Sequence, residues 1–282
     1  MSFKLSAFAD EVSNELARQI SYLNGKNIEY LEIRSLDGKN VGDLTLTEAK
    51  ETYRRLSDNG VKVWSVGSRI GKIGIKDDFA PHLDEFKRTL EITHALESDK
   101  IRMFSFYIPQ GENAEVYRDE VMERLDRFVE CSNGSGILLC HENEKRIYGD
   151  NAERCLDIAK TFPQMKLVFD PANFVQCGVD TLKAWDMLKG YLRYVHIKDA
   201  LADGSIVPSG CGIGNIPQIL EDYKAMGGGV LTLEPHLTVF QGLASLERDG
   251  EKTKQLYEYP DAETAFSAAV DALRAIINKI NV

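Results

Sequence analysis

The chain has 282 residues, of which 43% are hydrophobic and 28% are charged, a composition typical of globular proteins. Its formal net charge of −10 disfavours nucleic acid and anionic membrane surfaces as main partners. No apolar run approaches the roughly 18 residues of a membrane span, residues 1–12 do not resemble a secretory leader, and the five cysteines form no Cys-x-x-Cys motif. We therefore expect a cytoplasmic protein with reduced thiols.

Short apolar runs alternate with segments of helical periodicity along the whole chain. The apolar runs predict strands at 4–9, 30–35, 62–67, 101–108, 136–142, 166–170, 192–198 and 230–235. The periodic segments predict helices at 13–25, 45–60, 80–98, 114–134, 150–162, 180–190, 216–228 and 261–280. Among the helix starts, we expect Thr47 to cap the second helix and Asp180 to cap the sixth.

This alternation predicts one architecture. Strand followed by helix, repeated eight times, implies parallel strands joined by right-handed crossovers. Units of about 35 residues predict an α/β fold, a single-domain (β/α)₈ TIM barrel over residues 1–282. A doubly wound open sheet is the alternative. It would usually carry a glycine-rich turn after the first strand, and residues 8–15 contain no glycine.

One segment breaks the regular spacing. Residues 237–260, between the eighth strand and the last helix, are long for a loop of a barrel. Such a loop lies on the catalytic face. It is a lid, a contact between subunits, or a packed excursion without a chemical role, and the sequence does not separate these.

Polar residues follow the last four predicted strands. The carboxyl ends of barrel strands face the active site. The motifs there deliver one candidate ligand from each strand, namely Glu142, Asp170, His196 and Glu234. Three carboxylates and an imidazole suit one divalent metal ion (Mn²⁺, Mg²⁺, Co²⁺ or Zn²⁺) and differ from a closed structural zinc site. Each residue alone could instead pair with a rim Lys or Arg, but converging acids without a cation would repel one another.

Further polar residues stand next to these ligands. Lys198 shares a strand side with His196 and is expected either to bind a substrate oxygen or to pair with a barrel acid. His236 has the same relation to Glu234, and contact with a ligand and packing at the rim are both open. Asp199 could orient Lys198 or a nearby loop.

Two other features are less informative. Glu32 and Arg34 on the second strand point the same way, which favours an ion pair inside the barrel over contacts with sugar hydroxyls. The glycines of 209–217 could present backbone N–H groups to a phosphate, but no Lys or Arg lies among them, so we do not predict a phosphorylated substrate. Cys211 in this loop lacks an evident catalytic partner.

Five motifs carry a resemblance to a known family: "HEN" (141–143), "DPAN" (170–173), "HIKD" (196–199), "GCGIG" (210–214) and "LEPH" (233–236). In these motifs the sequence resembles the xylose-isomerase-like barrel superfamily. That superfamily includes sugar epimerases, sugar-phosphate isomerases, inosose dehydratases and endonuclease IV. The resemblance extends along most of the chain, and it is more specific for the superfamily than for any one substrate.

The resemblance implies a function for the four candidate ligands. In the sugar epimerases the metal is held by Glu, Asp, His and Glu, which correspond to Glu142, Asp170, His196 and Glu234. The two glutamates are the implied acid/base pair. The leading hypothesis is a metal-dependent isomerase or epimerase that converts a keto-sugar, sugar acid or related polyol through an enediolate. The expected partner is a small carbohydrate, and a homo-oligomer is compatible with the sequence.

Departures from the family patterns narrow this hypothesis. Asn173 stands where the ketose epimerases place a sugar-contacting His, so it joins Lys198 and His236 as an expected substrate-binding residue. The extra histidines of the three-zinc endonucleases are missing from 63–70, 103–109 and 199–205, which disfavours DNA repair. A lyase, dehydratase or glycoside-cleaving enzyme on the same metal site remains the alternative. A non-catalytic sugar-binding barrel is less favoured because none of the four ligands is missing.

Overall fold

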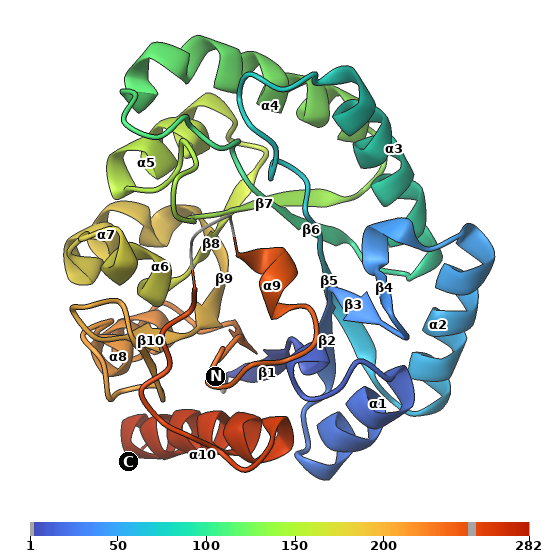
Figure 1. Ribbon diagram of the computed structural model, residues 1–282, viewed down its shortest axis with the longest axis vertical. Coiled ribbons are helices and arrows are strands. Elements are labelled where there is room, and N and C mark those ends of the chain that lie inside the picture. The colour runs from blue at the N-terminus through green and yellow to red at the C-terminus, as the bar shows by residue number, and fades with distance from the viewer. Residues whose placement is uncertain (1–2, 248–251, 282) are drawn as a thin grey trace.

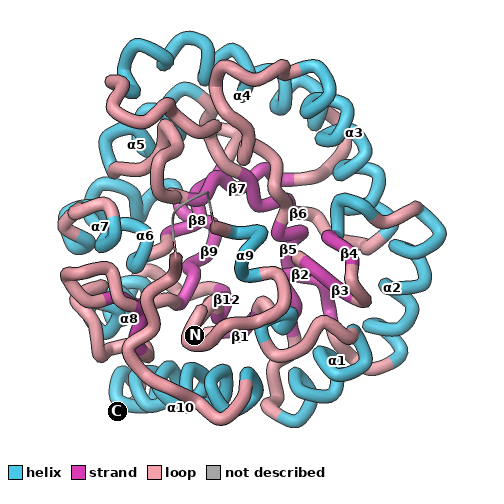
Figure 2. Tube along the Cα trace, viewed as in Figure 1, coloured by secondary structure: helices cyan, strands magenta, loops and turns pink. Residues whose placement is uncertain are grey.

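The computed structural model describes residues 3–247 and 252–281. Within these residues, eight parallel strands close a barrel in the order β1-β12-β9-β8-β7-β6-β5-β2. Helices surround this ring (Figure 1, Figure 2), so the predicted (β/α)₈ fold is confirmed. The barrel strands are β1 (Lys4–Ala7), β2 (Tyr30–Ile33), β5 (Lys62–Gly67), β6 (Lys100–Met103), β7 (Leu138–Glu142), β8 (Lys166–Phe169), β9 (Leu192–Ile197) and β12 (Val230–Leu233).

The outer layer consists of one main helix after each strand. These helices are α1 (Leu16–Gly25), α2 (Leu46–Asp58), α3 (Ala80–Ala95), α4 (Arg118–Ser132), α5 (Ala152–Thr161), α7 (Thr181–Leu188), α8 (Ile216–Ala225) and α10 (Ala262–Ile280). The described part of the chain also contains two short helices, α6 (Pro171–Gln176) and α9 (Leu243–Leu246). Two small hairpins pair β3 (Ser35–Leu36) with β4 (Lys39–Asn40) and β10 (Asp199–Ala200) with β11 (Ile206–Val207). Turns of 3₁₀ helix lie at Ala9–Glu11 (η1), Val41–Asp43, Ala114–Tyr117 and Lys189–Tyr191. None of the helices in the described residues is long and apolar enough to cross a membrane.

Alternation along the strands separates two cores. On β9, Val195 and Ile197 pack in the large apolar layer between barrel and helices. Tyr194 lies in a smaller cluster with Trp64 and Cys140. Because side chains alternate along a strand, His196 lies on the same side of β9 as Tyr194 and faces the barrel interior.

The capping residue agrees with the prediction for helix α7 and differs from it for helix α2. Asp180 caps α7 by accepting hydrogen bonds from two backbone N–H groups, as predicted. Helix α2 is capped by Thr45, whose hydroxyl accepts from the backbone of Glu48 while the Glu48 carboxylate accepts from the backbone of Thr45. The prediction for Thr47 was therefore wrong, because this reciprocal capping box starts the helix two residues earlier.

Two local differences shape the face of the barrel at the carboxyl ends. The predicted strand 101–108 ends at Met103, and the chain then turns through Phe106, which has a φ of 64°. Helix α6 was not predicted. It begins directly after β8, where Asp170 Oδ1 accepts a hydrogen bond from the backbone of Asn173 at 2.9 Å and Pro171 occupies the first turn. One oxygen of Asp170 is thus used as a helix cap, and the other remains for the site.

The segment 237–260 crosses this face of the barrel. Leu237, Phe240 and Leu243 are buried, with at most 8% of each side chain exposed. Helix α9 lies in front of the barrel ring in the view of Figure 1. Residues 248–251 of the segment lie outside the described residues. The described part is therefore packed onto the mouth of the barrel and forms part of its cavity wall.

Candidate metal centre

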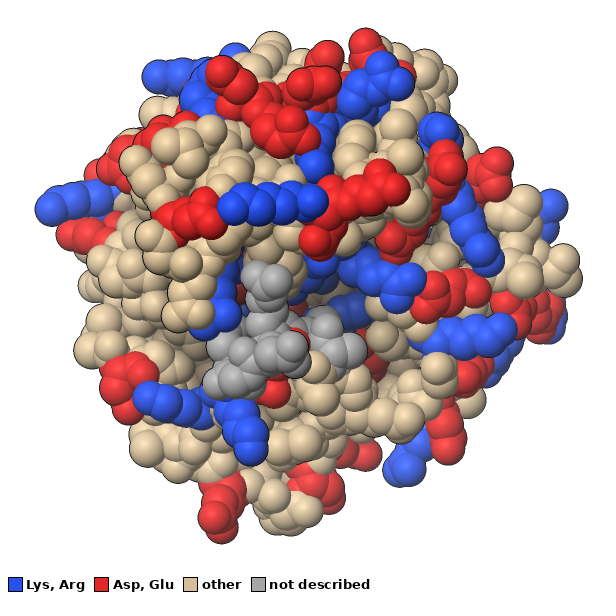
Figure 3. Space-filling view, turned by 45° about the horizontal axis from the view of Figure 1, so that its top comes forward, with Lys and Arg blue, Asp and Glu red and all other residues tan. Residues whose placement is uncertain are grey.

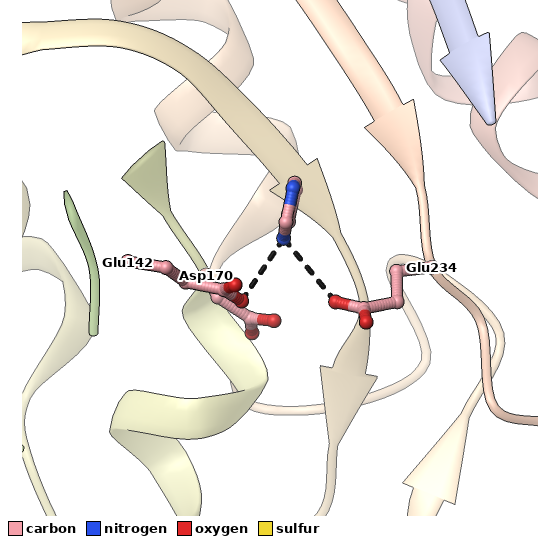
Figure 4. Close-up of side chains that lie close together, drawn as sticks. Glu142, Asp170 and Glu234 are labelled. Atoms are coloured by element: carbon pink, nitrogen blue, oxygen red, sulfur yellow. Dashed lines mark hydrogen bonds and ion pairs between the residues drawn. The ribbon is translucent and has the colours of Figure 1, made fainter. Parts of the chain in front are cut away.

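The four predicted ligands come together at the carboxyl ends of β7, β8, β9 and β12. Each offers one ligand atom, and these atoms all lie within 4.8 Å of one another. All four side chains are buried. Figure 4 shows Glu142 and Asp170 on one side of the cluster and Glu234 on the other. Adjacent parallel strands bring their ends to one edge, which explains why residues far apart in sequence meet here.

His196 lies at the middle of this cluster. Its Nδ1 is 3.0 Å from Glu142 Oε1 and 3.2 Å from Glu234 Oε2. Its Nε2 is 3.1 Å from Glu32 Oε2, and Phe8 packs edge-on against the ring. A carboxylate on one ring nitrogen fixes the tautomer and orients the other nitrogen toward a metal. Glu32 therefore orients Nδ1 toward the three candidate carboxylate ligands.

The charge of His196 depends on these neighbours. Burial lowers the pKa of the imidazole, but the carboxylates of Glu142 and Glu32 raise it further, so the pKa lies well above its ordinary value. In the metal-free protein a protonated imidazole thus supplies positive charge between the acids. A divalent cation at Nδ1 would replace that proton and would likewise compensate the negative charge of the surrounding carboxylates.

Lys198 pairs with a barrel acid, which was one of its two expected roles. Its Nζ lies 2.8 Å from Asp170 Oδ2 and 3.5 Å from Glu234 Oε2. Burial raises the pKa of Asp170 to about 6, and the Lys198 ammonium opposes that rise. Neither Asp170 Oδ2 nor Glu234 Oε2 accepts a hydrogen bond from any residue that the structure describes. Within the described chain, these two buried oxygens have only ion-pair contacts, with Lys198 and, for Glu234, with His196. Together with the imidazole nitrogen they fit the donor set of a divalent cation.

Arg34 holds the outer side of Glu234. Its guanidinium contacts Asp10 at 2.8 and 3.1 Å and Glu234 Oε1 at 2.9 Å. Glu32 instead accepts a hydrogen bond from Tyr194 at 2.6 Å inside the barrel. The predicted ion pair between Glu32 and Arg34 was therefore wrong. Arg34 lies beyond the end of β2, where the acids after β1 and β12 are nearer to it than Glu32 is.

Arg102 on β6 also belongs to the site, although the sequence patterns did not single it out. Its Nε lies 3.2 Å from Glu142 Oε2, and one terminal nitrogen donates to the carbonyl of Ser68 at 3.0 Å. The guanidinium also stacks over Phe104, 4.7 Å from the ring centroid. A charged residue inside the apolar run 101–108 was the available signal. Arg102 thus positions Glu142 as Arg34 positions Glu234.

Asn173 and His236 both line the cavity above the candidate ligands. The Asn173 amide donates to the carbonyl of Asn143 at 2.9 Å and reaches Glu142 Oε1 at 3.4 Å. His236 Nε2 lies 3.5 Å from Glu234 Oε1 and 3.4 Å from Glu11 Oε1, a residue that the sequence analysis also missed although it follows the first strand. All three expected substrate-binding residues are therefore at this cavity, Lys198 included.

Asp199 orients a loop rather than Lys198. Its carboxylate accepts hydrogen bonds from the backbones of Gly210, Gly212 and Gly214 at 2.8, 3.1 and 2.9 Å. A Cβ atom at Gly212 would lie 2.3 Å from the Asp199 carboxylate, which explains the need for glycine there. These N–H groups donate inward to Asp199, so they are not free to bind a phosphate. Cys211 in the same loop is exposed and forms no disulfide.

The described residues of segment 237–260 contribute to the cavity wall. Leu243, Glu247, Lys252 and Thr253 from that segment line the cavity together with Glu142 and the residues around it.

The fold and the position of the site define a (β/α)₈ barrel with a candidate metal centre at the carboxyl ends of its strands. Residues 27–275 match the family described as xylose isomerase-like TIM barrel, and the chain belongs to that family. Comparison with curated protein sequences gives no match.

Solved structures share the fold at low sequence identity. An L-ribulose 3-epimerase superimposes with a TM-score of 0.77 at 17% identity and covers 100% of this chain and 96% of that chain. The IOLI protein with a bound zinc atom superimposes with a TM-score of 0.75 at 17% identity and covers 98% of this chain and 99% of that chain. The probable 3-DHS dehydratase AsbF of Bacillus anthracis superimposes with a TM-score of 0.74 at 16% identity and covers 97% of this chain and 99% of that chain.

Proposed function

We propose that the protein is a divalent-metal-dependent enzyme that isomerises or epimerises a keto-sugar, a sugar acid or a related polyol. One observation carries this proposal. Glu142 and Glu234 approach His196 Nδ1 from opposite sides, at 3.0 and 3.2 Å. Two carboxylates on opposite sides of one position can remove a proton from one face of a substrate carbon and return it to the other.

The ligand set assigned to the cation is Glu142, Asp170, His196 and Glu234. It suits one Mn²⁺, Mg²⁺, Co²⁺ or Zn²⁺ ion. When bound, such an ion would polarise a substrate carbonyl and stabilise the negative charge that develops when an α-proton leaves. Asp170 Oδ2 and Glu234 Oε2, which are buried and form no hydrogen bond with a described residue, support this assignment.

The acid/base roles fall to Glu142 and Glu234. One carboxylate takes the proton from the carbon beside the carbonyl, and the other returns a proton to the opposite face or to the neighbouring carbon. Arg102 and Arg34 hold the two carboxylates at 3.2 and 2.9 Å. Such fixed positions favour proton transfer even though neighbouring positive charge lowers carboxylate basicity.

Asn173, Lys198 and His236 are the proposed substrate-binding residues. They line the cavity with an amide, an ammonium and an imidazole, groups that bind hydroxyl and carbonyl oxygens. The fold similarity to an epimerase and to a zinc-containing barrel supports the proposal. A dehydratase is the second candidate, because the Lys198 ammonium, 3.5 Å from Glu234, could stabilise a departing hydroxide.

The test begins with the cation. We expect the wild-type protein to bind Mn²⁺ or Zn²⁺ in equilibrium dialysis, and Glu142→Gln and His196→Ala to bind at least about 100-fold more weakly, since loss of a direct ligand exceeds the effect of an outer partner. Glu51→Gln on exposed α2 is the matched control. If the ligand variants bind metal like the parent, the metal assignment is wrong.

The reaction is tested with keto-sugars and inososes in D₂O. Deuterium at the α-carbon without loss of the carbon skeleton or of water supports isomerisation or epimerisation. Loss of water supports the dehydratase. A protein that binds metal but exchanges no substrate proton would support a non-catalytic barrel instead.

A further inference from the structure

The mouth above the candidate metal ligands is basic, although the chain as a whole has a net charge of −10. Figure 3 shows blue Lys and Arg atoms inside the hollow on this face. Four carboxylates line the described cavity wall, against six basic side chains: Arg34, Lys72, Arg102, Lys145, Lys198 and Lys252. A divalent cation would add further positive charge. Lined in this way, the mouth attracts anions.

A second hollow of ≈ 330 Å³ adjoins this cavity. It shares Arg34, Lys72 and Arg102 with the first, and Lys39 and Arg69 line its outer part. No carboxylate lines it among the described residues. The three shared basic residues therefore stand between the metal centre and a space where a second part of a substrate could lie.

The counter-charges of these cations differ. Arg34 is fully engaged by Asp10 and Glu234. Arg102 has only Glu142 close by, at 3.2 Å, because Glu32 is 3.9 Å away and is shared with other groups. Its Nε forms no hydrogen bond to a described residue. A cation bound to Glu142 would compensate the negative charge of that carboxylate. Arg102 would then have no close carboxylate left among the described residues to balance its positive charge.

Lys72 lines the same two hollows as Arg102. Both cations lie over the Phe104 ring, with Lys72 Nζ 4.3 Å from its centroid. Lys72 also pairs with Glu144 at 3.1 Å, and its side chain is 15% exposed. Lys145, on the same cavity, forms no ion pair within the described part of the chain. The pair of Lys72 and Arg102 is thus presented to both hollows.

We propose that the substrate of the metal centre carries an anionic group, a carboxylate or a phosphate, that binds to Lys72 and Arg102. This inference rests on the proposed function and names its substrate class. With Glu142 bound to the cation, a neutral sugar would leave Arg102 without a counter-charge, whereas an anion would form charge-assisted hydrogen bonds with its guanidinium. The two anion chemistries share this recognition and are separated by experiment.

The test measures binding rather than turnover. Isothermal titration calorimetry of the Mn²⁺-loaded protein uses D-fructose, D-fructose 6-phosphate and 5-keto-D-gluconate as probes. At least one anionic probe should bind ten times more tightly than D-fructose, and its affinity should fall as NaCl is raised from 50 to 300 mM. Lys72→Gln should remove most of the preference and leave D-fructose affinity within twofold.

Two further variants sharpen the result. Arg102→Lys keeps the charge but loses the planar fork, so it should weaken the anionic probe less than Arg102→Gln does. Lys62→Gln, at the start of β5 and therefore at the other end of the barrel, should change nothing. Tighter binding of the phosphate probe identifies a sugar phosphate as substrate, and tighter binding of the keto acid identifies a sugar acid.

Equal affinities for all three probes, no binding of any of them, or an unchanged preference in Lys72→Gln would each overturn the inference. If the protein binds a divalent ion and exchanges the α-proton of a neutral sugar, only this inference fails. If it binds no divalent ion, the proposed function fails with it.

Discussion

Glu32→Gln tests whether the carboxylate behind His196 prepares it to bind a metal. Glu32 is fully buried, and its Oε2 lies 3.1 Å from His196 Nε2 while Oε1 accepts a hydrogen bond from Tyr194. The amide has nearly the same shape as the carboxylate, so the barrel should fold. The change removes the negative charge that orients the ring and increases its basicity.

The size of the effect follows from that position. Removing an outer partner of a metal-bound histidine typically weakens metal binding about 10–100-fold, or roughly 1.4–2.7 kcal/mol. We expect Zn²⁺ affinity, measured by competition with a chromophoric chelator, to fall within this range. Tyr194→Phe should cost less, because it removes a hydrogen bond to Oε1 and leaves the contact between Oε2 and His196 intact.

A clear refutation is available. It is a Glu32→Gln protein that is folded, as judged by circular dichroism, and still binds Zn²⁺ as tightly as the wild type. In that case Glu32 does not orient Nδ1 of His196 as a metal ligand. A loss of affinity in Tyr194→Phe equal to that in Glu32→Gln would instead indicate general loosening of the barrel interior.

Two other predictions concern stability. Asp199→Ala should lower the free energy of unfolding in urea by about 2 kcal/mol, because the N–H groups of loop 210–214 lose their acceptor; an unchanged midpoint would contradict this. Hydrogen bonds from His82 and Arg69 hold the pKa of Glu85 at about 2, below its ordinary value of 4.5. The ionised carboxylate therefore stabilises the fold above about pH 4.5, and this contribution is lost as the pH falls toward 2. Glu85→Gln should be less stable than wild type by about 2 kcal/mol at pH 7, after discounting for partial exposure, and the difference should vanish near pH 2; a difference independent of pH would refute this origin.

Much of the fold could be predicted from local patterns. Apolar runs and helical periodicity repeat in every unit, and each unit needs only its own residues to be recognised. Helix α6 was missed because Asp170 was interpreted only as a ligand. The Asp-Pro pair is also a helix start, with an acceptor at the cap and proline in the first turn. The early end of β6 depends on the backbone of Phe106, which sequence patterns do not report.

The candidate ligands could be predicted because strand order fixes which ends are neighbours. The residues around them could not, because their partners come from distant strands. Arg34 contacts Glu234, 200 positions away, and His196 contacts Glu32, 164 positions away. Two residues on one side of a strand, such as Glu32 and Arg34, need not pair when other charges lie nearer. Such contacts become visible only when the barrel is closed.

Closure of the barrel has a consequence for folding. Strand β1 pairs with β12 from Lys4 opposite Val230 to Ala7 opposite Leu233, and Phe8 donates to the carbonyl of Leu233. The acids that follow β1 and the glutamate that follows β12 share Arg34. During synthesis these groups are separated by more than 200 residues, so the cluster cannot assemble until the last strand has emerged and joined the first. Closing the ring and completing the charge arrangement around Glu234 both require β12, so folding intermediates that lack β12 lack the site as well.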